Sequence, residues 1–283
     1  MSGGKNRSRR RQGSAALAVF LVLLCLFTCS CGKEESELKK VLGNGPVKVL
    51  CLTYYEDGVG SGQWGVLTSK TDEDGIAADE EAHLEVLFPA DLKTLREMKG
   101  LETFRLTFGP SLPDEERETL MEALPEARVY VLSRCTDAEL TVLGKISGME
   151  ELHLNGEIDL ETLPETGAKA IWLSNCLNIP WKTIASQPAL ETIVYNNAEG
   201  EIMRTEVLRA LAGSATLREL VYFLPVDLWD PEDLEARSDS GSYPLRIESP
   251  DEVPEWLCES LDAGDLEVFL SGGRSISLYP GHW

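Results

Sequence analysis

The feature that most constrains this chain is an apolar-x-apolar pair that returns at a nearly regular interval. Successive pairs begin 34, 20, 26, 22, 19, 22, 27, 25 and 23 residues apart, which indicates an imperfect repeat. Each pair predicts a short strand with both apolar side chains on one buried face. The pairs are Leu50/Leu52, Leu84/Val86, Phe104/Leu106, Tyr130/Leu132, Leu152/Leu154, Ile171/Leu173, Ile193/Tyr195, Leu220/Tyr222, Leu245/Ile247 and Val268/Leu270.

Several pairs carry a further apolar residue three positions earlier, as in "LETFRL", "MEELHL" and "LRELVY", and these runs read as L-x-x-L-x-L. The segments between them, such as "PADLKTLREMKG" and "RTEVLRALAGS", combine helix-start residues with apolar positions three or four apart. Each unit is therefore expected to be one strand plus one helix or turn. A single unit cannot bury its apolar face, whereas stacked units bury each other's.

From Val47 to the C-terminus the chain resembles the leucine-rich repeat family. That family places Asn or Cys three residues beyond the last leucine of the motif, and Cys176 in "IWLSNC" matches this position. The resemblance implies an α/β fold, an irregular solenoid with a curved parallel sheet and with helices or turns on its convex side. We expect it to span residues 46–283, with an irregular N-terminal cap over 46–90 and a short C-terminal cap over 271–283.

The residues between the paired core positions should lie on the exposed, concave sheet face. This column is unusually apolar at its centre, and small hydrogen-bonding residues follow it. An apolar centre with a polar surround suits a protein or peptide interface. The alternative is that these residues are ordinary strand formers covered by a loop, or a self-association surface. The candidate binding residues are Val131, His153, Trp172, Val194, Val221 and Phe223.

The N-terminus has the composition of an export signal. Basic residues precede an uncharged apolar run of 13 residues, from Ala15 to Phe27, which is short for a bilayer span of about 20. A retained signal anchor is the alternative, because counting through Cys31 gives 17 residues.

Cys31 follows small or polar residues and precedes the charged segment "GKEESELKK". This region resembles a bacterial lipoprotein precursor, which implies cleavage before Cys31 and lipid modification of its thiol. We therefore expect a leader over residues 1–31, a flexible charged tether over 32–45, and an exported protein anchored by lipid on the extracytoplasmic face of the cell membrane.

The net charge of −22 argues against nucleic acid as a partner, because phosphates would be repelled. The first 31 residues hold five of the 26 basic residues and no acidic ones, so their removal leaves a net charge of −27. The remaining cysteines, Cys51, Cys135, Cys176 and Cys258, are widely spaced, and we expect mostly buried free thiols.

Metal and catalytic motifs are weak or missing. The stretch from Lys70 to Glu81 places Asp72, Asp74 and Glu81 at calcium-loop positions, but the cation at its first position favours a plain acidic surface loop. No nucleophile elbow, phosphate-binding loop or dinucleotide fingerprint occurs, and no cofactor is expected. The sequence thus predicts a non-catalytic surface binding protein. The alternatives are a surface hydrolase with a carboxylate-based site and a structural component of the envelope.

Overall fold

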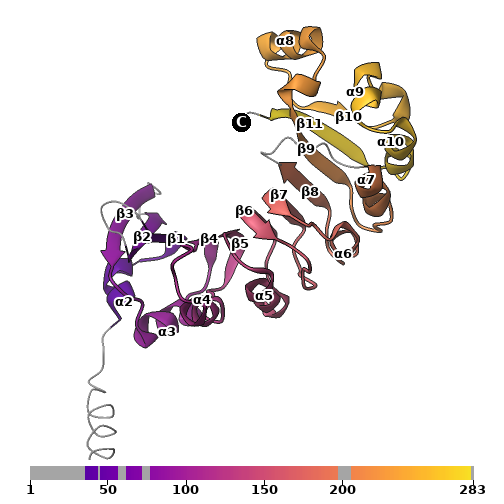
Figure 1. Cartoon of the computed structure of the whole chain (residues 1–283). Coiled ribbons are helices and arrows are strands. Elements are labelled where there is room, and N and C mark those ends of the chain that lie inside the picture. Colours follow the sequence, from indigo (N-terminus) through magenta and orange to yellow (C-terminus); the bar gives the residue numbers. More distant parts are fainter. Residues whose placement is uncertain (1–35, 44, 57–61, 72–76, 197–204, 282–283) are drawn as a thin grey trace, which may run out of the picture.

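The computed structural model describes residues 36–43, 45–56, 62–71, 77–196 and 205–281. They form an α/β structure around one 11-stranded sheet in the order β10-β11-β9-β8-β7-β6-β5-β4-β1-β2-β3. The sheet is open, because β10 and β3 lie at its two edges. Figure 1 shows that the sheet is curved and that the helices following its central strands cover its outer face.

Parallel pairing runs through the body of the sheet, while β2, β3 and β10 pair antiparallel at its two ends. The strands are β1 (Val47–Tyr55), β2 (Gln63–Thr71), β3 (Ala77–Leu84), β4 (Leu101–Thr107), β5 (Ala127–Ser133), β6 (Glu151–Asp159), β7 (Ala170–Leu177), β8 (Thr192–Asn196), β9 (Glu219–Pro225), β10 (Leu245–Ile247) and β11 (Ser275–Gly281).

Helices or short helical turns follow most of the parallel strands. The α-helices are α2 (Glu37–Leu42), α3 (Pro89–Glu97), α4 (Asp114–Met121), α5 (Asp137–Leu140), α6 (Trp181–Ala185), α7 (Thr205–Ala212), α8 (Pro231–Ser240), α9 (Glu255–Ser260) and α10 (Ala263–Leu270). The 3-10 turns are η1 (Thr141–Lys145), η2 (Val226–Leu228) and η3 (Pro250–Glu252).

The predicted core pairs of the central strands lie side by side in register. Leu152 of β6 is opposite Tyr130 of β5 and Ile171 of β7, and all three are fully buried. Because the register repeats from β1 to β9, the apolar side chains form one continuous core between the sheet and its helices. The alternating pattern thus correctly predicted which face of these strands is buried.

A backbone conformation just after the last core position also repeats in three neighbouring units. Arg134, Gly156 and Asn175 each lie two residues beyond the last core position, and each has a positive φ, of 61°, 83° and 57°. In two of these units the next residue is a buried cysteine, Cys135 or Cys176. The Cys176 thiol donates to the Leu154 carbonyl of the preceding strand at 3.5 Å.

The pairs predicted nearest the two ends are partly wrong. Val268 and Leu270 belong to helix α10, because Asp262 caps its N-terminus and Leu266, Phe269 and Leu270 bury one helical face. The pair Leu84/Val86 contributes only its first residue to a strand, the antiparallel edge strand β3. The pair Leu245/Ile247 forms the antiparallel edge strand β10.

The expected C-terminal cap is an integral strand. Residues 275–281 form β11, which lies between β9 and β10 and runs parallel to β9, with Ile276 opposite Leu220 and Leu278 opposite Tyr222. At the other end, residues 46–90 contain β1, β2 and β3, which continue the same sheet.

Part of the segment expected as a flexible tether is folded. Ser36 caps α2, and Leu38 and Leu42, four residues apart, bury its inner face. The buried carboxylate of Asp91 on α3 accepts hydrogen bonds from the Ser36 hydroxyl at 2.7 Å and the Leu38 amide at 2.8 Å. Residues 36–43 therefore belong to the fold. Within the described ranges, none of the helices has the length and apolar character needed to cross a membrane.

Candidate functional site

The candidate binding residues come together on the inner face of the sheet. Val131, His153, Trp172, Val194 and Val221 are direct neighbours on β5 to β9. We call the line of register partners on the parallel strands the central row; it comprises Cys51, Arg105, Val131, His153, Trp172, Val194, Val221 and Ser277. Phe223 lies two residues further along β9, between Asn196 and Tyr279.

The candidate residues differ in how much of their surface is accessible to solvent. Trp172 is the most exposed, at 37%, and Val131, His153, Val221 and Phe223 are half-buried. The prediction that Val194 contacts a ligand is wrong, because only 4% of its surface is accessible, although it lies outside the main core cluster. Its larger neighbour Trp172 and its neighbour Val221 flank it on the same face, so Val194 supports the surface without offering contact area.

Two aromatic pairs are stacked on this face. The rings of His153 and Trp172 lie 4.7 Å apart and within 14° of parallel. The rings of Phe223 and Tyr279 lie 5.3 Å apart and within 18° of parallel. The Glu151 carboxylate lies 3.1 Å from Nε2 of His153, which holds the imidazole in the stack. Because these rings are already ordered, a ligand that contacts them loses little side-chain entropy.

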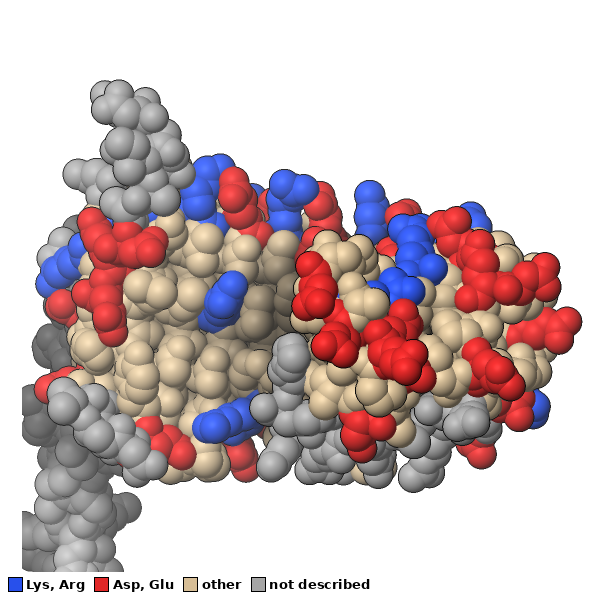
Figure 2. All heavy atoms as spheres, turned by 90° about the horizontal axis from the view of Figure 1, so that it is seen from above, with Lys and Arg blue, Asp and Glu red and all other residues tan. Residues whose placement is uncertain are grey.

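Uncharged hydrogen-bonding residues border the central row on its carboxyl side. Figure 2 shows a hollowed surface that is mostly uncharged, with one basic group within it and the acidic groups along its margins. In a protein of net charge −22, such a face can lose its water at low electrostatic cost. The bordering residues are Thr53, Thr107, Ser133, Asn155, Ser174 and Asn196.

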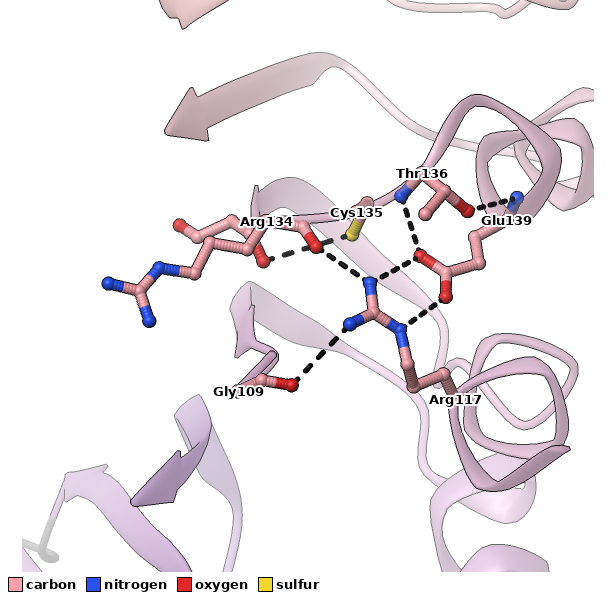
Figure 3. A network of polar contacts seen from close by, with 7 residues as sticks. Gly109, Arg117, Arg134, Cys135, Thr136 and Glu139 are labelled. Carbon is pink, nitrogen blue, oxygen red and sulfur yellow. Dashed lines mark hydrogen bonds and ion pairs between the residues drawn. The ribbon is translucent and has the colours of Figure 1, made fainter. Parts of the chain in front are cut away.

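A buried ion pair holds the loops at the carboxyl edge of β4 and β5 (Figure 3). Arg117 of α4 donates from Nε to Glu139 of α5 at 2.5 Å and from Nη2 at 3.0 Å. The same guanidinium donates to the carbonyl of Arg134 at 2.7 Å and to that of Gly109 at 3.5 Å. Hydrogen bonding to Glu139 raises the pKa of Arg117, so the guanidinium stays protonated. This network joins two successive units beneath the inner face.

The cysteines near the site have the environment of structural thiols. Burial raises the pKa of Cys135, and burial raises that of Cys176 to about 12. Cys51 is half-buried and Cys258 is exposed, and all four described cysteines are free. Of the four thiols expected to be free and mostly buried, all four are free, and two, Cys135 and Cys176, are buried.

The calcium-loop hypothesis receives no support from the described ranges. Glu81 lies exposed on β3, whereas Asp72 and Asp74 fall outside the described residues, as does Cys31. The part of the chain that the structure describes contains no group of three or more His, Cys, Asp or Glu side chains that could hold a metal ion.

Tyr279 and Ser277 are the neighbours that the sequence reasoning missed. Both belong to β11, where the alternation in "SISLY" was a usable signal, but that segment was interpreted as a cap. The chain matches no protein-family model, no curated protein and no solved structure. The residues of the site therefore carry the functional argument.

Proposed function

We propose that this chain is an exported, lipid-anchored binding protein with an irregular leucine-rich-repeat-like solenoid, whose concave face binds a protein or peptide at the cell surface. The observation that carries the proposal is the exposed, pre-stacked His153–Trp172 pair within a nearly uncharged face of a strongly acidic protein. Apolar and aromatic anchors surrounded by polar residues are typical of such interfaces.

The repeat of register, core position and backbone conformation supports the solenoid. Eight consecutive members of the central row occupy equivalent strand positions, and three successive units share a positive φ two residues beyond the last core position. The apolar run before Cys31 supports export and lipid anchoring.

Two carboxyl groups with a lowered pKa belong to exposed ion pairs. Hydrogen bonding to Lys48 lowers the pKa of Glu102, and hydrogen bonding to Arg128 lowers that of Glu150. A general acid working near neutral pH needs a displacement in the opposite direction.

Selection from a display library of random peptides tests the proposal. The library is selected on the wild-type chain, and each selected peptide is then measured on the Trp172→Ala/Phe223→Ala variant. We expect affinity to fall at least about tenfold, because truncation of an interface anchor typically costs 2 kcal/mol or more.

Val268→Ala is the matched control, because Val268 is an exposed apolar residue on α10, away from the sheet face. It should bind the peptides like the wild type. Equal affinity for the wild type and the double variant would refute the proposed concave site.

A further inference from the structure

Arg105 is a cation without an ionic partner in the central row. Its side chain is exposed on β4, and no described residue forms an ion pair with it. This is unusual here, since the chain has 48 acidic residues and several other described arginines pair with a carboxylate.

The residues directly beside Arg105 in the sheet register are uncharged. Its neighbours across the ladder are Cys51 and Val131, and its neighbours on the same face of β4 are Thr103 and Thr107. Thr53 and Ser133 lie diagonally beside it. The guanidinium is thus bordered by hydroxyl groups, which can donate to an anion but cannot neutralise the cation.

An exposed guanidinium that has no ion-pair partner and is surrounded by hydroxyl groups can bind a carboxylate. Arginine binds carboxylates through two parallel N–H donors, and such charge-assisted hydrogen bonds are stronger than neutral ones. Among the eight residues of the central row, Arg105 is the one cation that offers this pairing. Glu151 lies on the amino side of the row next to His153, where it would repel an anionic ligand group. Charge complementarity therefore selects the partner and also its orientation.

The register sets the spacing between the cation and the aromatic anchor. Arg105 and Trp172 are three strand steps apart, through Val131 and His153. With neighbouring strands about 4.8 Å apart, the separation is about 14 Å, which an extended polypeptide covers in about four residues. Ser133, Asn155 and Ser174 lie alongside this path and can hydrogen-bond to a peptide backbone.

We propose that the partner is a polypeptide segment that lies across the central row, with an apolar side chain on Trp172 and, about four residues away, a carboxylate on Arg105. This inference rests on the proposed function and adds the chemistry and the spacing of the ligand. The carboxylate belongs either to an Asp or Glu side chain or to the end of the peptide chain.

The experiment compares two random peptide libraries on the full-length chain, one with blocked C-termini and one with free C-termini. We expect selected peptides to carry a carboxylate three to five residues from an apolar residue. Enrichment in the blocked library identifies a side-chain carboxylate, and enrichment confined to the free library identifies the chain end. Arg105→Gln should weaken these peptides about tenfold or more, as should replacing their Glu by Gln, and the two changes together should cost little more than either alone.

Arg218→Gln is the matched control, because Arg218 is another exposed arginine without an ion pair among the described residues, and it precedes β9 outside the central row. It should leave the affinities unchanged. Peptides that depend on Trp172 but carry no enriched carboxylate, or that bind Arg105→Gln normally, would overturn the inference and leave the proposed function standing. If no selected peptide depends on Trp172 and Phe223, both fail. Arg105-dependent binding of a sulfated glycan without any peptide would also overturn the inference.

Discussion

The Arg117–Glu139 pair provides the sharpest stability test of this structure. The two side chains are only 8% and 4% exposed, so neither charge has water to replace a lost partner. Replacing Arg117 with Met removes two hydrogen bonds to Glu139 and leaves a buried carboxylate whose remaining donor is the Thr136 amide at 2.7 Å. Breaking a buried pair in this way costs about 3–5 kcal/mol.

The expected loss is a large share of the stability of an ordinary domain, which is about 5–15 kcal/mol. For a chain of this size it corresponds to a fall in Tm of roughly 6–20 °C. The double variant Arg117→Met/Glu139→Leu should be more stable than Arg117→Met alone, because it removes the uncompensated charge together with its partner.

Urea denaturation followed by circular dichroism measures both free energies of unfolding. Lys93→Met is the control, because Lys93 pairs with Glu97 on the exposed surface of α3 at 3.7 Å, and such pairs contribute at most about 1 kcal/mol. A loss below about 1 kcal/mol for Arg117→Met, or a double variant less stable than the single one, would refute the buried-pair reasoning.

Three further outcomes are expected. Gly272→Ala should lower the free energy of unfolding by about 1.5–3 kcal/mol in urea denaturation. A Cβ at this position would lie 1.7 Å from Nη1 of Arg274, whose guanidinium donates hydrogen bonds to carbonyls at the ends of α7 and α10. An unchanged denaturation midpoint would contradict this. At pH 8, a thiol reagent should label Cys258 rapidly in the folded protein, whereas Cys176, whose pKa burial raises to about 12, should react only after unfolding; mass spectrometry of the labelled peptides decides. Hydrogen bonding to Arg128 lowers the pKa of Glu150 below its usual value of 4.5. The ion pair should therefore stabilise the fold above pH 4.5, and this stabilisation should be lost as the pH falls through the lowered pKa. In acid titrations of stability, a Glu150→Gln variant should lack this pH dependence.

The central strands were predictable because their information is local. Alternation places Leu152 and Leu154 in the core and His153 outside, and the structure has them so. Parallel neighbours were expected from the resemblance to the leucine-rich repeat family, and the central strands do pair in parallel. The alternation depends on period, which the sequence displays directly.

The ends of the sheet were harder to predict. The apolar pair Val268/Leu270 fits a strand as well as a helix, and the Asp262 cap together with burial against the neighbouring elements decided for a helix. The segment of β11 was expected only as a cap over the last unit, so Tyr279 was absent from the predicted face. The tether prediction failed similarly, because the pairing of Ser36 with Asp91 joins residues 55 positions apart.

The sequence by itself determined the repeating strand-and-helix unit, the composition of the exposed column, and the acidic character of the chain. Only the tertiary structure decided which side chains of that column remain accessible, because exposure depends on neighbouring strands: Trp172 stays open while Val194 beside it is covered. It also decided that the residues directly beside Arg105 in the sheet are uncharged. Ion pairing depends on distances across strands that are far apart in the chain, and the linear order of residues does not contain these distances.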